Sequence, residues 1–107
     1  RKLRRDGFRF TDSQRADLES LNRSVKTYTH DIHEALSASN PNILTSTDAS
    51  GKRIRDQVKA LRRKHLEELS AGTIPPVVSV AFMAALNAYI RVRDHARNIA
   101  ETIALEK

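Results

Sequence analysis

Hydrophobic residues recur at alternating steps of three and four along the first third of this 107-residue chain. The stripe consists of Leu18, Leu21, Val25, Tyr28, Ile32 and Ala35. Such steps keep side chains on one narrow side of an α-helix, which then packs against a partner helix. Thr11 or Asp12 can cap the first turn. The helix must end before Asn40-Pro41, because a residue that precedes proline disfavours the helical conformation. The sequence therefore predicts a helix over about residues 12–38.

A second stripe with helical spacing follows a polar loop. It consists of Ile54, Val58, Leu61, His65 and Leu69. Thr47 or Asp48 precedes this stripe as a candidate N-cap. Gly72 follows it and can adopt the left-handed conformation that ends many helices. These signals predict a second helix over about residues 48–71.

The last part of the chain is the most apolar. Pro75 and Pro76 open it, and proline is tolerated in a first helical turn because its missing amide has no partner there. We expect a third helix over about residues 76–105. Its first half is apolar nearly all round, so it is either buried on several sides or offers a second face to a partner. The side chains we expect at such an interaction face are Phe82, Met83 and Leu86.

Three helices with short connections predict an all-α fold, an antiparallel three-helix bundle. The bundle covers residues 11–107 and follows a basic N-terminal segment, residues 1–10, in which four of the first five side chains are cationic. Glycine and proline number three each, too few for an all-β domain with many tight turns. The length suits one domain.

The charge balance is basic, with 19 Lys and Arg against 13 Asp and Glu and a formal net charge of +6. Nucleic acid, anionic lipid and phosphate-bearing ligands all fit this balance. A cationic stripe on the second helix is the candidate anion or lipid surface: Lys52, Arg55, Lys59, Arg62 and Arg63. The alternative is an ordinary solvated face, partly neutralised by nearby carboxylates. Aromatic residues make up only 5% of the chain, which argues against a stacking platform for single strands.

Histidines and carboxylates at helical spacing form one candidate metal site. Its residues are His30, Glu34, Asp94 and Glu101. His30 and Glu34 are four residues apart, a spacing that can place two ligands on one metal. The alternative is that these are ordinary polar side chains on helix surfaces, with Asp94 paired to Arg91 or Arg97. We expect no cofactor, with a divalent metal left open.

Catalytic patterns are missing from the sequence. There is no cysteine, the three glycines are isolated, and no nucleophile–base pair for acyl transfer stands out. We therefore do not expect an enzyme.

One motif near the C-terminus resembles the signature of PhoU-type domains. In that family an Asp-His pair is followed two residues later by Asn-Ile-Ala-Glu, and residues 94–101 read Asp-His-Ala-Arg-Asn-Ile-Ala-Glu. The family-motif residues are Asp94, His95, Asn98 and Glu101. Residues 64–72 resemble the end of the second helix in the PhoU-like domain attached to bacterial sodium/phosphate cotransporters.

This resemblance implies a single PhoU-like repeat, where full PhoU proteins carry two. It implies a cytoplasmic regulatory or accessory domain of a sodium-dependent phosphate cotransporter, involved in phosphate transport or its regulation. The implied partner is the membrane transporter portion of the same polypeptide, at the cytoplasmic side of the membrane. The basic segment 1–10 fits a position just beyond a last membrane helix. A second copy of the chain and an anionic lipid surface are further partners, and no nucleic acid is expected.

The chain departs from the family at one position. Metal-binding members carry an acidic residue four positions before the motif aspartate, and here that position is Ile90. An isoleucine offers no oxygen ligand, which argues against the family's metal site. Two alternatives stay open: a small basic helical nucleic-acid-binding domain, and a free-standing metal-binding PhoU-type phosphate regulator.

Overall fold

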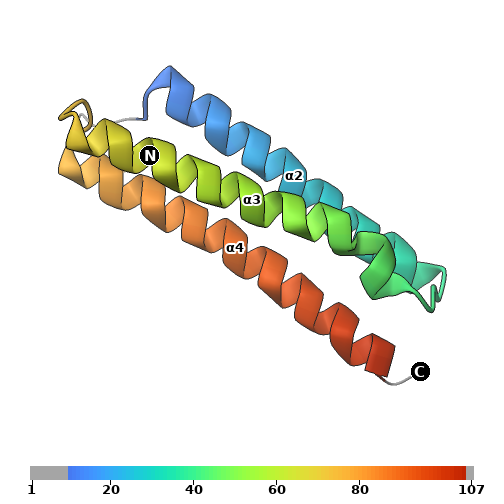
Figure 1. Ribbon diagram of the computed structural model, residues 1–107. Coiled ribbons are helices and arrows are strands. Elements are labelled where there is room, and N and C mark those ends of the chain that lie inside the picture. Colours follow the sequence, from blue (N-terminus) through green and yellow to red (C-terminus); the bar gives the residue numbers. More distant parts are fainter. Residues whose placement is uncertain (1–9, 106–107) are drawn as a thin grey trace.

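A computed structural model of the chain describes residues 10–105. Within that range the chain forms three helices that run up, down and up, and every pair of helices is in contact (Figure 1). The helices are α2 (Asp12–Ser37), α3 (Ile43–Ser70) and α4 (Pro76–Leu105). The predicted all-α, antiparallel three-helix bundle is confirmed. The basic segment 1–10 lies outside the described residues except for Phe10.

A capping box begins α2. The Thr11 hydroxyl accepts a hydrogen bond from the Gln14 amide at 3.1 Å, and the Gln14 side chain accepts one from the Thr11 amide at 2.9 Å. Each side chain thus satisfies an amide that has no partner inside the helix. Thr11, one of the two predicted caps, is therefore the N-cap.

The start of α3 differs from the prediction. The helix begins at Ile43, not at residue 48. Ile43 is 2% exposed and belongs to the core, so burial extends the helix toward its N-terminus by more than a turn. Thr47 is not a cap: it lies inside α3, where its hydroxyl donates to the Ile43 carbonyl at 2.7 Å. The sequence does not distinguish a threonine whose hydroxyl donates to the carbonyl four residues earlier from a threonine that caps a helix N-terminus.

All three helices meet closely around Gly51 of α3. A Cβ atom at this position would lie 3.0 Å from Cε1 of Tyr28 on α2, and Tyr28 is 1% exposed. From α4, Nε of Arg93 donates to the Gly51 carbonyl at 3.3 Å. The missing side chain therefore allows α2 and α3 to approach and lets α4 bind the α3 backbone.

The predicted interaction face on α4 is wrong. Phe82 and Leu86 are 2% and 0% exposed and lie in the core, and Met83 is partly buried against it. The exposed large apolar residues of α4 are Val77, Val80, Val92 and Ile99. An apolar pattern that covers most of a helix does not reveal which side its two partners will cover. Here α2 and α3 cover the side with the largest residues.

Candidate functional site

The motif residues at positions 94–101 lie mostly on the surface of α4. Asp94, His95 and Asn98 are exposed, and Glu101 is half-buried. Ala100 alone is fully buried, at 0% exposure. Packing of the core therefore accounts for the alanine but not for the four polar side chains.

Arginines neutralise both carboxylates of this motif. Nη1 of Arg93 donates to Asp94 at 2.6 Å. The partner of Asp94 is therefore Arg93, and not Arg91 or Arg97, the two arginines that the sequence suggested. Nε of Arg97 lies 3.3 Å from a Glu101 oxygen, and its Nη1 lies 3.6 Å from Asp48 of α3. The Arg97 contacts connect the C-terminal half of α4 to the start of α3.

The structure does not bring the predicted metal ligands together. His30 and Glu34 are exposed on α2, whereas Asp94 and Glu101 are engaged by arginines on α4. Nowhere in residues 10–105 do three or more His, Asp or Glu side chains gather closely enough to hold a metal ion. The prediction of this four-residue metal site is wrong, because two of its members face solvent on α2.

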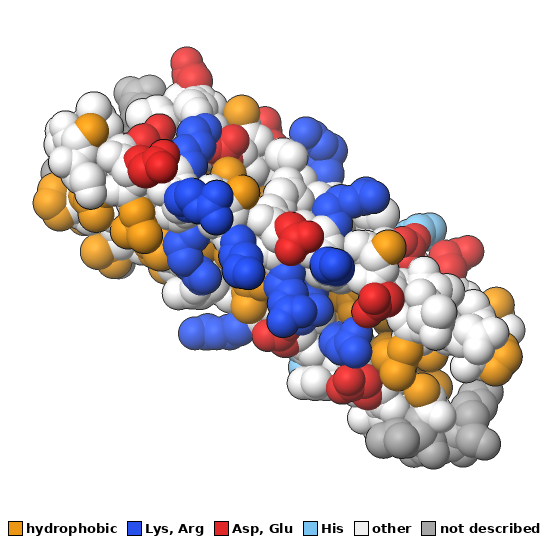
Figure 2. Space-filling view, viewed as in Figure 1, with side chains coloured by type: hydrophobic (Ala, Val, Ile, Leu, Met, Phe, Trp, Pro, Cys, Tyr) orange, Lys and Arg blue, Asp and Glu red, His pale blue; other side chains and the backbone are white. Residues whose placement is uncertain are grey.

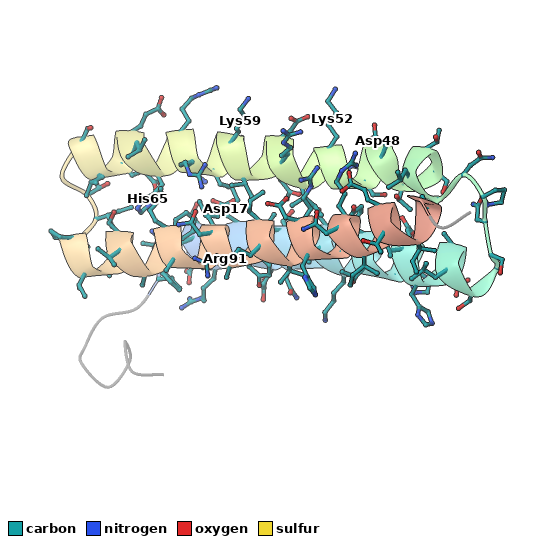
Figure 3. All side chains as sticks on the ribbon, turned by 90° about the horizontal axis from the view of Figure 1, so that it is seen from below. Asp17, Asp48, Lys52, Lys59, His65 and Arg91 are labelled. Atoms are coloured by element: carbon teal, nitrogen blue, oxygen red, sulfur yellow. The ribbon has the colours of Figure 1, made fainter. Side chains whose placement is uncertain are left out.

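The predicted cationic stripe forms a basic face along α3. Its members are Lys52, Arg55, Lys59, Arg62 and Arg63. Among the described residues none of the five forms an ion pair, although Nη2 of Arg62 donates to the Asn87 side chain of α4 at 2.9 Å. Lys and Arg side chains follow one another across this side of the molecule (Figure 2). Lys52 and Lys59 point away from the bundle (Figure 3).

An apolar patch lies at one end of the bundle, where α3 ends and α4 begins. Leu66, Val77 and Val80 are 51%, 44% and 71% exposed. A hydrogen bond of 2.8 Å between the buried side chains of His65 and Ser79 joins the two helices at this end. Figure 2 shows hydrophobic side chains gathered there. We call Leu66, Val77 and Val80 the apolar end.

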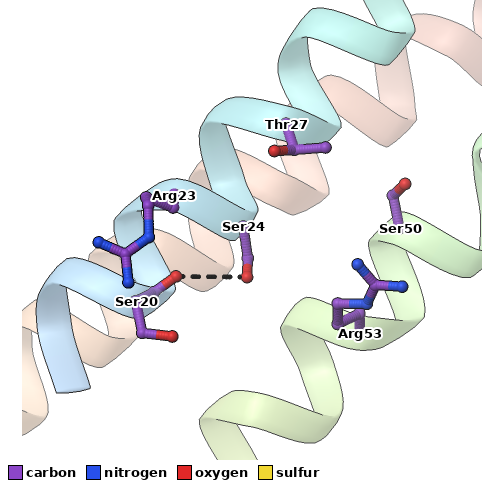
Figure 4. Close-up of a pocket in the computed structure, with 6 residues that line it drawn as sticks. All are labelled: Ser20, Arg23, Ser24, Thr27, Ser50 and Arg53. Atoms are coloured by element: carbon purple, nitrogen blue, oxygen red, sulfur yellow. Dashed lines mark hydrogen bonds between the residues drawn. The ribbon is translucent and has the colours of Figure 1, made fainter.

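Sequence reasoning missed a polar pocket between α2 and α3. The pocket has a volume of about 170 Å³. It is lined by Ser20, Arg23, Ser24, Thr27, Ser50 and Arg53 (Figure 4). A signal was present in the sequence, since polar residues of α2 recur at helical spacing beside the hydrophobic stripe. Such residues look like ordinary solvated positions until the partner helix is known.

Comparisons with known proteins gave no match: none to protein-family models, none to curated proteins and none to solved structures. In the part of the chain that the structure describes, no helix has both the length and the apolarity needed to cross a membrane.

Proposed function

We propose that this chain is a PhoU-like accessory domain of a sodium-dependent phosphate cotransporter and that it acts by contact rather than by catalysis. The observation that carries this proposal is the exposure of the family motif. Asp94, His95 and Asn98 are exposed on the surface of α4, and within the described part of the chain Asp94 is the one whose side chain has a partner, the neighbouring Arg93. Polar side chains held on a rigid helix are well placed to recognise a partner.

Contact of this kind regulates by differential affinity. A domain that binds one conformation of a transporter more tightly than another shifts the equilibrium toward the tighter one. A difference of about 1.4 kcal/mol changes the ratio of two states tenfold. The exposed motif on α4 supplies the side chains for such discrimination.

The basic face and the apolar end support a location beside a membrane. Cationic side chains near anionic headgroups contribute about 1 kcal/mol each. Leu66 and Val80 add exposed apolar surface at one end of the same helical pair, and such patches commonly mark contact sites. Together they favour the cytoplasmic surface of the membrane and the transporter portion beside it.

Phosphate uptake tests the proposal directly. Cells that carry the intact gene are compared with cells whose gene lacks the codons for residues 1–107, and radiolabelled phosphate uptake is measured with and without sodium. Reading the coding DNA upstream of Arg1 shows whether membrane segments belong to the same polypeptide. We expect the deletion to change sodium-dependent uptake while the amount of transporter in the membrane stays constant. Equal uptake in both strains at equal transporter level would contradict the proposal.

The unpaired cations of the basic face favour one second candidate, a nucleic-acid-binding domain. A helix that reads bases commonly carries Asn or Gln among its arginines, but the side chain of Gln57 on α3 is held between α2 and α3 by Ser20 and Ser24. Only phosphate contacts are left, and these bind without sequence preference. Titration with duplex DNA tests this candidate, because its affinity must fall steeply with salt.

A further inference from the structure

Polar contacts run beside the hydrophobic core in a ladder between α2 and α3. Nζ of Lys64 donates to Asp17 at 2.8 Å and to Ser13 at 3.0 Å. One step along, the Gln57 side chain bonds to Ser20 and Ser24, and after another step the Ser50 hydroxyl donates to Asp31 at 3.0 Å. The α3 members, at positions 64, 57 and 50, and the α2 members, at positions 17, 24 and 31, both repeat every seven residues.

The polar pocket lies between the second and third steps of this ladder. Arg53 extends along α3 toward Ser50, and Arg23 lies along α2 beside Ser20 (Figure 4). Neither arginine forms an ion pair with any residue that the structure describes. Both side chains are exposed, so each can rotate toward the pocket without disturbing the core.

The hydroxyl hydrogens around the pocket can be assigned one by one. Ser50 gives its hydrogen to Asp31, and Ser24 shares its hydrogen between the Gln57 side chain at 2.7 Å and the Ser20 carbonyl at 3.3 Å. The Ser20 hydroxyl accepts from Nε2 of Gln57 at 3.0 Å and keeps its own hydrogen. Thr27 also lines the pocket, and its hydroxyl takes no part in the hydrogen bonds among these side chains. Two hydroxyl donors therefore line the pocket.

We propose that this pocket binds a tetrahedral oxyanion of the phosphate class, either free or as the head of a phosphate monoester. Two guanidinium groups and two hydroxyls offer donors, and no carboxylate belongs to the lining. The planar fork of arginine fits phosphate oxygens with two parallel hydrogen bonds. A volume of about 170 Å³ holds such an ion together with water.

Asp31 sets one boundary of the site. Its carboxylate is one hydrogen bond away from the lining, through Ser50. Repulsion from this charge favours a position of the anion near Ser20, at the Gln57 end of the pocket. It also limits affinity, so replacing Asp31 by Asn is expected to strengthen binding.

The pocket is separate from the motif and from the basic face. The motif is on α4, and the pocket lies between α2 and α3. The pocket proposal does not rest on the proposed function, so failure of the uptake test would leave it standing. Failure of anion binding would likewise leave the uptake test unaffected.

Titration of the isotope-labelled 107-residue chain with inorganic phosphate tests the site, with NMR shifts of the Arg53 and Arg23 side chains as the readout. Sodium chloride at matched ionic strength controls for screening. The variants are Arg53→Gln and Thr27→Val, which remove donors from the pocket. The matched control is Arg55→Gln, which makes the same charge change two residues away on the basic face. A parallel titration with glycerol phosphate distinguishes an esterified ligand from the free ion.

We expect saturable shifts at the pocket and weakening of binding by about tenfold or more in Arg53→Gln, because a charge-assisted hydrogen bond is lost. Thr27→Val is expected to weaken binding severalfold, and Arg55→Gln to leave it unchanged. Saturation by phosphate assigns the free ion, and saturation by glycerol phosphate alone assigns the ester. Equal weakening by Arg53→Gln and Arg55→Gln, or shifts from neither ligand beyond those of sodium chloride, would overturn the proposal.

Discussion

Single residues decide how closely the helices of this bundle approach, and Gly51 is the clearest case. The Gly51→Ala substitution adds a Cβ atom 3.0 Å from a buried Tyr28 ring carbon. Overpacking of this kind costs about 1–3 kcal/mol, and the better helix propensity of alanine returns about 1 kcal/mol. We expect a net loss of about 1 kcal/mol, measured by urea unfolding.

The Tyr28→Leu background provides the control for this prediction, because it removes the ring that the new methyl group meets. The loss caused by Gly51→Ala should shrink there, which a double-mutant cycle detects. A Gly51→Ala protein more stable than the parent would show that the close approach is not tight.

Tyr28 also makes the fold sensitive to alkali. Burial raises the pKa of its phenol above the ordinary 10.0, although Arg93 and Arg97 act in the opposite direction. The folded chain thus keeps a proton that the unfolded chain releases, so stability falls as pH rises past about 10. The hydrogen bond to Asp17 raises the pKa of Lys64, which acts in the same direction.

Unfolding free energies between about pH 8 and pH 11 measure this effect. In Tyr28→Phe the decline should be shallower than in the parent, and the part owed to Lys64 should remain. Identical slopes for Tyr28→Phe and the parent would mean that the phenol does not titrate with folding.

At the residue scale the sequence was a partial guide. The helical spacing puts His65 in the hydrophobic stripe, and His65 is indeed buried, at 1% exposure. Its partners were not predictable: Nε2 bonds to Ser79, and the ring stacks on Phe82 with centroids 4.7 Å apart. Both come from α4, whose packing side the pattern left open. The pocket was missed for the same physical reason, since it exists only where two helices meet.

Helix boundaries show where local signals suffice. The Thr11 cap was predictable because a capping box depends on residues three apart. The start of α3 was not, because burial of Ile43 is a tertiary effect that outweighs the cap-like pair Thr47-Asp48. For α2 and α3 the spacing of the hydrophobic stripe was enough to predict the buried side of the helix. For α4 it was not, because apolar residues occur on nearly all sides of its first half.

Removal of the N-cap of α2 tests whether the Thr11 side chain stabilises the start of this helix. Thr11→Ala removes the bond to the Gln14 amide, and such losses cost about 1 kcal/mol. Thermal or urea unfolding measures the change. Thr45→Ala is the control, because Thr45 is exposed within the first turn of α3. Equal effects of the two substitutions would contradict a capping role for Thr11.

At the scale of the whole molecule, the three polar surfaces lie at different places on the bundle. The basic face follows α3, the polar pocket lies between α2 and α3, and the motif is on α4. If the basic face meets anionic lipid, replacing one of its cations by a neutral residue weakens binding by about 1 kcal/mol, or roughly fivefold.

Vesicles of mixed neutral and anionic lipid test that face with Lys59→Gln. Sedimentation should show weaker binding than for the parent, and salt should reduce binding by both. Lys26→Gln removes an exposed cation from α2 and should leave binding nearly unchanged. Equal losses for the two variants would assign the binding to net charge rather than to this face.

The proposed function requires that the exposed motif residues of α4 act on phosphate transport rather than stabilise the fold. The most direct measurement is sodium-dependent phosphate uptake by cells whose intact gene carries Asp94→Asn with Asn98→Ala, beside His33→Gln with Glu34→Gln on the exposed side of α2. We predict altered uptake for the α4 pair alone, with the melting temperature of both variant chains close to that of the parent. Unchanged uptake in the α4 pair, or the same change in the α2 pair, would contradict the claim.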